Sequence, residues 1–192
     1  MKAVLISIQP KRCEKIADGE ETIEVRKTMP KLERPFKCYI YCTKEKKKDD
    51  FITISGAFGL IRCPECAIYN RVKEYDCNGK VIGEFICKGI MRPNDSLKLM
   101  AKQSCLTENE LIEYSNGKML YGWHITDLKI YAKPKELSEF YTRCYSGCDK
   151  CKYKSWDYDF SSGKDLICTV SNKKPITRPP QSWCYVEELQ NG

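Results

Sequence analysis

The sequence predicts an α+β protein built on a curled, mostly antiparallel sheet. Segments in which apolar and polar residues alternate are interrupted by short helical patterns, and the two kinds follow each other in irregular order. A chain of 192 residues is long enough for one well-buried core and an appendage. We therefore expect one main domain and a smaller C-terminal part.

The N-terminal block has the pattern strand, helix, strand. Residues 4–6 are apolar and extended, and Pro10 suits the first turn of a helix. Residues 22–26 alternate between apolar and polar side chains, so Glu24 and Arg26 fall on the same strand face. Two oppositely charged side chains are therefore expected to project together from the second strand.

Further strands and helices are predicted along the rest of the chain. The strands cover residues 36–43, 81–88 and 121–131, and in the first of these Cys38 and Cys42 lie on the core face. Thr107 and Glu110 have the spacing of a capping box, which predicts a short helix ending near residues 116–117. A last helix is expected from Pro134, because Leu137, Phe140, Tyr141 and Cys144 fall at helical spacing.

The charge balance favours a polyanionic partner. The chain has 33 Lys and Arg against 26 Asp and Glu, a net charge of +7, which attracts nucleic acid at long range and low salt. No apolar run approaches the roughly 20 residues of a membrane span, so no membrane association is expected. The N-terminal apolar stretch is interrupted by Ser7 and Gln9, which predicts no export signal and a cytoplasmic protein.

The cysteines favour reduced thiols and bound metal over disulfides. Their number, 13, is odd, and no export signal accompanies them. Near the C-terminus Cys144, Cys148, Cys151 and Cys168 have a spacing that can bring four thiolates to one structural zinc ion. Cys63 and Cys66 form a second, weaker candidate. We expect a barrel at residues 1–135, a helix with this appendage at 136–175, and a segment at 176–192 that docks back on the barrel.

Residues 19–26 resemble the helix-to-strand turn of the ASCH-domain family, whose pattern is GxKxxExR. Gly19, Glu24 and Arg26 match this pattern, whereas Glu21 replaces the Lys. The resemblance covers about residues 2–135, and the ending at residues 180–186 is similar to the tail of a subgroup of the family that is common in bacterial and phage genomes. It implies a PUA-like barrel with a cleft beside the first helix that binds RNA or a modified nucleoside.

The expected binding residues surround this turn. The cleft is predicted to contain Lys11, Arg12, Gly19, Glu21, Glu24, Arg26, Lys27, Trp123 and His124. The basic side chains would contact phosphates, and an aromatic ring could stack on a base. The alternative for Trp123 and His124 is a strand with a buried indole and a hydrogen-bonded imidazole.

Three functions remain open from the sequence, of which noncatalytic binding of RNA or a nucleotide is the leading one. The second is a hydrolase acting on RNA or a modified nucleoside, with Glu24 as the candidate catalytic residue. Family members that hydrolyse N4-acetylcytidine use a Lys where this chain has Glu21, and Ser104 falls near the place of their acid. Glu21 and Glu24 could instead bind a divalent cation. The third function is a phage-type module that contacts a protein partner.

Overall fold

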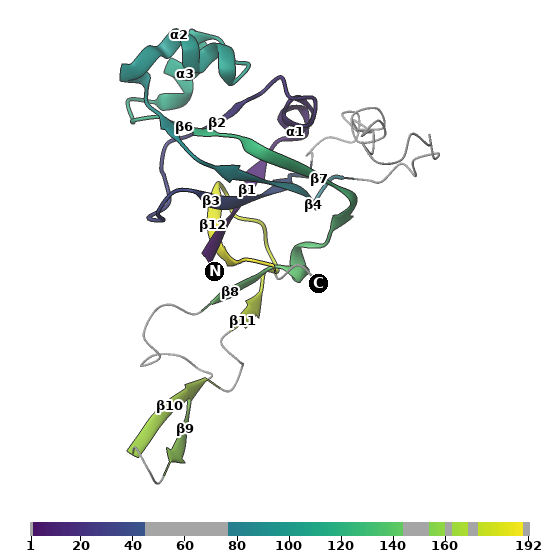
Figure 1. Ribbon diagram of the computed structural model, residues 1–192, viewed down its shortest axis with the longest axis vertical. Coiled ribbons are helices and arrows are strands. Elements are labelled where there is room, and N and C mark those ends of the chain that lie inside the picture. The colour runs from purple at the N-terminus through teal and green to yellow at the C-terminus, as the bar shows by residue number, and fades with distance from the viewer. Residues whose placement is uncertain (1, 45–76, 144–153, 160–162, 169–172, 190–192) are drawn as a thin grey trace.

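The computed structural model describes residues 2–44, 77–143, 154–159, 163–168 and 173–189. The strands of its two larger sheets are β1 (Lys2–Ile8), β2 (Ile23–Arg26), β3 (Phe36–Cys42), β4 (Val81–Cys87), β5 (Ile90–Met91), β6 (Tyr121–His124), β7 (Thr126–Lys135) and β12 (Trp183–Glu187). The main sheet has the order β12-β1-β3-β4-β7, and the second has the order β2-β6-β5 (Figure 1). Only β1 and β3 pair in parallel within these sheets. The α+β class with a mostly antiparallel sheet is confirmed.

The helices are α1 (Pro10–Ala17), α2 (Pro93–Gln103) and α3 (Glu108–Ser115). Pro10 occupies the first turn of α1, where its missing N–H costs no helical hydrogen bond. The capping box of α3 is confirmed: the N–H of Glu110 donates to Thr107 Oγ1 over 3.2 Å, and the N–H of Thr107 donates back to the Glu110 carboxylate over 2.7 Å. None of these helices has the length and apolar character needed to cross a bilayer.

The second sheet lies between the main sheet and the helices α2 and α3 (Figure 1). The apolar layer under the helices consists of Ile23, Val25, Met91, Met100, Ala101, Leu111 and Leu120. On the other face of this sheet, Trp123 packs into the core of the main sheet. Strand β2 therefore turns Ile23 and Val25 toward the helices, and the predicted alternation leaves Glu24 and Arg26 on the opposite face.

The inner strands β1 and β3 of the main sheet are buried on both faces. Cys38 and Cys42 lie in the core that also contains buried residues of α1, as predicted. On the opposite face Tyr39 packs against Phe140, with ring centroids 4.9 Å apart. Strand β12 pairs with β1, which attaches the C-terminal segment to the edge of this sheet.

The helix predicted from Pro134 is wrong. Pro134 belongs to strand β7, and the residues after it form a single 3-10 turn, Leu137–Glu139, followed by β8 (Tyr141–Arg143). Strand β8 pairs with β11 (Lys173–Pro175), and the N–H of Ile176 donates to the carbonyl of Phe140 over 2.8 Å. Burial of Phe140 and pairing with a distant segment outweigh the helical spacing of the apolar side chains.

The remaining strands, β9 (Lys154–Asp159) and β10 (Gly163–Cys168), form an antiparallel hairpin. The predicted zinc ligands Cys144, Cys148 and Cys151 lie outside the described residues, and of Cys168 only the backbone is described. Cys63 and Cys66 also lie outside them. The zinc sites thus remain predictions.

Candidate functional site

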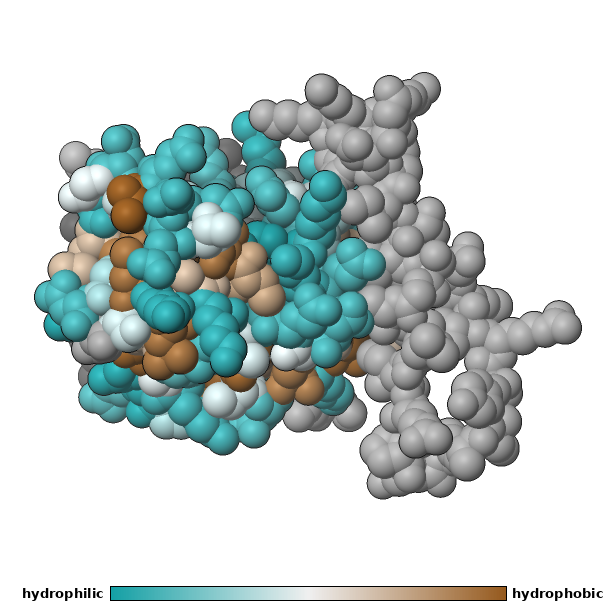
Figure 2. All heavy atoms as spheres, turned by 90° about the horizontal axis from the view of Figure 1, so that it is seen from above, coloured by the Kyte–Doolittle hydropathy of each residue, from teal (hydrophilic) through white to brown (hydrophobic). Residues whose placement is uncertain are grey.

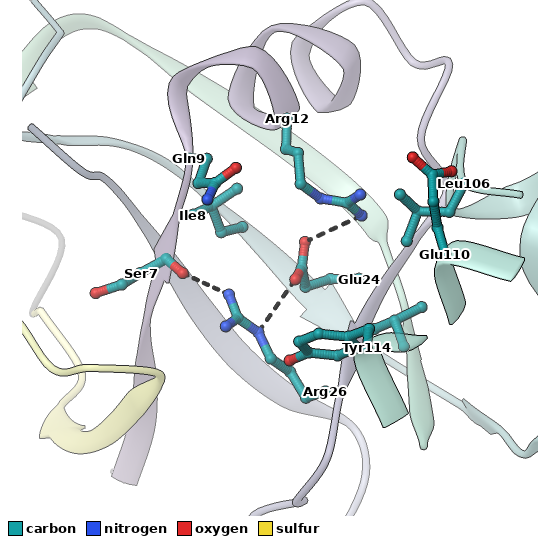
Figure 3. A pocket seen from close by; sticks show the side chains of 10 residues that line it. Ser7, Ile8, Gln9, Arg12, Glu24, Arg26, Leu106, Glu110 and Tyr114 are labelled. Atoms are coloured by element: carbon teal, nitrogen blue, oxygen red, sulfur yellow. Dashed lines mark hydrogen bonds and ion pairs between the residues drawn. The ribbon is translucent and has the colours of Figure 1, made fainter. Parts of the chain in front are cut away.

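A pocket of about 240 Å³ opens where α1, β2 and α3 approach one another. Its wall is formed by Ser7 and Gln9 before α1, Arg12 in α1, Glu24 and Arg26 in β2, and Glu110 and Tyr114 in α3. Glu24 lies at its centre, with Arg12 on one side and Arg26 on the other (Figure 3). The sequence-predicted turn residues Arg12, Glu24 and Arg26 thus come together in one cavity.

Gly19 makes this approach possible by ending α1. Its φ of +76° lies in the left-handed region, which side chains with a Cβ adopt rarely. A Cβ at this position would meet no atom within 4 Å, so backbone conformation alone requires glycine here. The resulting turn leads the chain from α1 into β2 and places the carboxyl groups of Glu21 and Glu24 next to the guanidinium of Arg12.

Glu24 and Arg26 form a buried ion pair, not the surface pair that alternation alone would allow. The Nε of Arg26 lies 3.1 Å from Glu24 Oε1, and the side chains are 11% and 4% exposed, respectively. Burying two charges is costly unless their remaining hydrogen-bonding atoms are also satisfied. The other contacts of Arg26 therefore decide whether this pair is held firmly.

Those contacts come from the first strand and from the C-terminal segment. Nη2 of Arg26 donates to the carbonyl of Ser7, and Nη1 lies 3.5 Å from the hydroxyl of Ser182. Ser7 is itself fixed, because its hydroxyl donates to the carbonyl of Pro180 over 2.6 Å and its N–H donates to Ser182 over 2.9 Å. Residues near both ends of the chain thus hold Arg26 in the pocket wall.

Arg12 lies between two carboxyl groups. Its Nη2 is 2.6 Å from Glu21 Oε1 and 3.9 Å from Glu24 Oε2, and it also donates to the carbonyl of Ser104 over 3.3 Å. A guanidinium thus already supplies the positive charge between Glu21 and Glu24, which disfavours the divalent cation considered above. No cluster of three or more metal-ligating side chains occurs in the part of the chain that the structure describes.

Arg12 retains donors for a ligand. Within the described residues, Nη2 is the only nitrogen of its guanidinium that has a partner, and its side chain is 20% exposed. Nε and Nη1 can therefore donate hydrogen bonds to a bound group. A charged donor of this kind forms stronger hydrogen bonds than a neutral one.

Glu21 is fully buried behind the pocket wall. Burial, followed by the neighbouring charge of Glu24, raises the pKa of Glu21 to about 9, although Arg12 acts in the opposite direction. Burial and the neighbouring Glu24 thus both favour the protonated form of Glu21.

The rim of the pocket on the α3 side is aromatic. Tyr114 is 39% exposed, and the Nζ of Lys27 lies 4.6 Å from the centroid of its ring. Glu110 also lines this side, but its carboxylate is held by Thr107, and the hydrogen bonds from Thr107 lower its pKa. Tyr114 was not foreseen from the sequence, because an exposed tyrosine on a helix has no distinguishing pattern.

Other predicted binding residues lie elsewhere. Trp123 is completely buried and packs edge-on against Phe36, with centroids 5.7 Å apart, so it does not line the pocket. His124 is half-buried, and its ring would contact a Cβ placed on Gly89. Lys11 is exposed on α1, and Lys27 does not line the pocket but contacts the ring of Tyr114, which does.

Comparisons with known proteins find distant structural likeness alone. No protein-family model matches the chain, and no curated protein matches it. A crystal structure of ASCH from Zymomonas mobilis aligns with 97% of this chain and 88% of that one, at 15% identity and a TM-score of 0.49. The chain is similar to an ASCH structure. A mutant of the same ASCH protein aligns with 98% of this chain and 92% of its own, with equal identity and TM-score. The likeness to ASCH is too distant to assign an activity to this chain.

Proposed function

We propose that this protein is a noncatalytic domain that binds RNA or a nucleotide in the pocket between α1, β2 and α3. The observation that carries the proposal is that Nε and Nη1 of Arg12 have no partner among the described residues. These donors lie in the pocket that also contains the buried pair of Glu24 and Arg26. Tyr114 adds an exposed ring on which a base can stack. The net charge of +7 favours a polyanion.

The size of the pocket favours a single unpaired nucleotide. A volume of about 240 Å³ is smaller than the ~300–1,000 Å³ of sites that enclose drug-sized ligands. Sequence-specific RNA recognition usually targets single-stranded segments, whose bases can leave the stack and enter such a pocket. We therefore expect single-stranded RNA to bind better than a duplex of the same length.

Replacing Arg12 with glutamine tests this proposal. We expect affinity for single-stranded RNA or a nucleotide to fall about tenfold to a hundredfold, because a charged hydrogen bond contributes ~1.5–3 kcal/mol. Glutamine can still bond to Glu21, which favours retention of the fold. Fluorescence anisotropy with a labelled oligonucleotide measures the change.

Lys129→Gln is the matched control, since it removes the same charge. Lys129 is exposed on β7 and does not line the pocket. Its replacement should change the affinity less than about threefold, through long-range charge alone. Equal losses for the two variants would contradict binding in this pocket.

A hydrolase is the second candidate, and the raised pKa of Glu21 beside Glu24 favours it, because perturbed carboxyl groups are frequent at active sites. Glu24→Gln would then abolish turnover of RNA or a modified nucleoside without unfolding the protein. Against this role, Arg26 engages Glu24 at 3.1 Å and lowers its availability as a base. Absence of turnover by the unaltered protein would count against this candidate.

A protein-interaction module is the third candidate. Figure 2 shows hydrophobic residues scattered between hydrophilic ones on the face seen from above. Leu99, Ile112 and Met119 are exposed by 43%, 58% and 45%. Scattered exposed apolar residues are common on soluble domains, so they favour this role only weakly. One stoichiometric protein that co-purifies after nuclease treatment would support it.

Structural zinc in the C-terminal part is a separate proposal. If Cys144, Cys148, Cys151 and Cys168 bind one ion, elemental mass spectrometry of protein purified without chelator should find about one zinc per chain. Replacing Cys148 with serine should remove that metal. A metal-free preparation would instead indicate reduced thiols.

A further inference from the structure

Two buried carboxyl oxygens at the pocket have no hydrogen-bond partner among the described residues. They are Oε2 of Glu21 and Oε2 of Glu24. A buried polar atom without a partner is costly, and two adjacent ionised carboxylates would also repel each other. The two carboxyl groups flank the same nitrogen: Nη2 of Arg12 lies 2.6 Å from Glu21 Oε1 and 3.9 Å from Glu24 Oε2. A hydrogen bond between two carboxyl groups requires a proton.

We propose that Glu21 and Glu24 share one proton, and that neutral Glu21 is a positioning residue for Glu24 and Arg12. Oε1 of Glu21 already accepts from Arg12 Nη2 over 2.6 Å, which leaves Oε2 to carry the proton. Oε1 of Glu24 lies 3.1 Å from Arg26 Nε, which leaves its Oε2 to accept. One proton between the two Oε2 atoms therefore satisfies both.

No other described group around the two carboxyl groups is seen to donate a hydrogen bond to their Oε2 atoms. From α1 the pair is faced by Arg12 and the thiol of Cys13, from β2 by Arg26, and from β3 by the thiol of Cys38. Burial raises the pKa of both Cys13 and Cys38, so these two thiols are neutral. On the α3 side Glu110 is engaged by Thr107.

The cluster then contains two guanidinium groups, one carboxylate and one neutral acid, with a net charge of +1. Glu21 fixes Nη2 of Arg12, while Nε and Nη1 keep no partner among the described residues and remain available to a ligand. This role rests on the proposed function wherever it concerns a ligand, because the positioned guanidinium is the group proposed to bind it. The proton itself can be tested without any ligand.

Glu21→Gln imitates the neutral acid. Its amide N–H can donate to Glu24, and its amide oxygen can accept from Arg12. In the unaltered protein the folded state keeps a proton that the unfolded chain loses above the ordinary carboxyl pKa. Stability contributed by this proton is complete below that pKa, and it declines as the pH rises toward about 9.

Urea unfolding at pH 6, 7 and 8 measures this difference. The folding equilibrium constant of the unaltered protein should fall relative to that of Glu21→Gln, by up to about tenfold per pH unit for one proton. Glu20→Gln is the control, since Glu20 is exposed and should leave the pH profile unchanged. A ratio that stays constant from pH 6 to 8 would overturn the shared proton.

A second readout applies if Glu21→Gln does not fold. The carboxyl carbon of Glu21 in the unaltered protein, followed by carbon-13 NMR, should titrate well above the ordinary range of glutamate. Titration near pH 4–5 would reject the proposal. Neither experiment includes RNA. If both contradict the shared proton, the binding function is still decided separately by the Arg12→Gln measurement.

Discussion

Replacing Arg26 with alanine should lower the free energy of unfolding by about 3–5 kcal/mol. The substitution leaves the carboxylate of Glu24 buried, at 4% exposure, without its partner at 3.1 Å. It also removes the donors to the carbonyl of Ser7 and the hydroxyl of Ser182. Urea denaturation at neutral pH measures the loss.

An exposed ion pair provides the control. Lys88 and Asp127 lie 2.8 Å apart, but their side chains are 55% and 58% exposed. Lys88→Ala should therefore cost less than about 1 kcal/mol. An Arg26→Ala protein as stable as Lys88→Ala would show that the pocket does not depend on the buried pair.

Trp123→Ala is expected to have a comparable effect, about 3–5 kcal/mol, through the core. The indole is completely buried between Phe36 and Trp183, with ring centroids 5.7 and 5.9 Å away. Removing it leaves a large cavity where the two sheets meet. Thermal or urea unfolding measures the change.

Comparing Tyr114→Ala with Trp123→Ala distinguishes an aromatic ring that binds RNA from one that stabilises the core. Tyr114 is 39% exposed, so its removal should change stability by only about 0.5 kcal/mol while weakening RNA binding. A Trp123→Ala protein that is stable but no longer binds RNA would contradict this assignment. It would indicate that Trp123 lines the binding cleft, as the sequence suggested.

Local patterns predicted the parts of the fold that depend on neighbouring residues. The alternation at residues 22–26 correctly placed Glu24 and Arg26 on one face, and the spacing of Thr107 and Glu110 correctly located the start of α3. Such signals follow from the periods of strands and helices, so they need no knowledge of distant contacts.

The errors arose where distant segments decide the structure. Phe140 adopts an extended conformation because Tyr39 and Ile176 contact it from other parts of the chain. Helix α2 was not predicted, and its regular pattern is broken at Ser96, whose φ is −178° and whose hydroxyl accepts from the N–H of Leu99. The spacing of apolar residues over a short stretch of sequence does not reveal contacts with distant segments or a break within a helix.

The site shows the same division. The turn pattern indicated Glu24 and Arg26, but it gave no sign that Ser7 and Ser182 would fix Arg26. Glu21, where the resembling family has a lysine, is instead the partner of Arg12. Both arginines thus contact carboxyl groups, and with Glu21 neutral the cluster keeps a net charge of only +1, so most of the long-range attraction of a polyanion comes from basic residues outside the pocket.

The most direct test of the binding function is NMR mapping of a short single-stranded RNA on isotope-labelled protein. Amide shifts should concentrate at residues that line the pocket, including Ser7, Arg12, Glu24, Arg26 and Tyr114. They should saturate with added RNA and be lost in the Arg12→Gln variant. Shifts concentrated away from α1, β2 and α3, or none at any concentration, would contradict the proposed binding site.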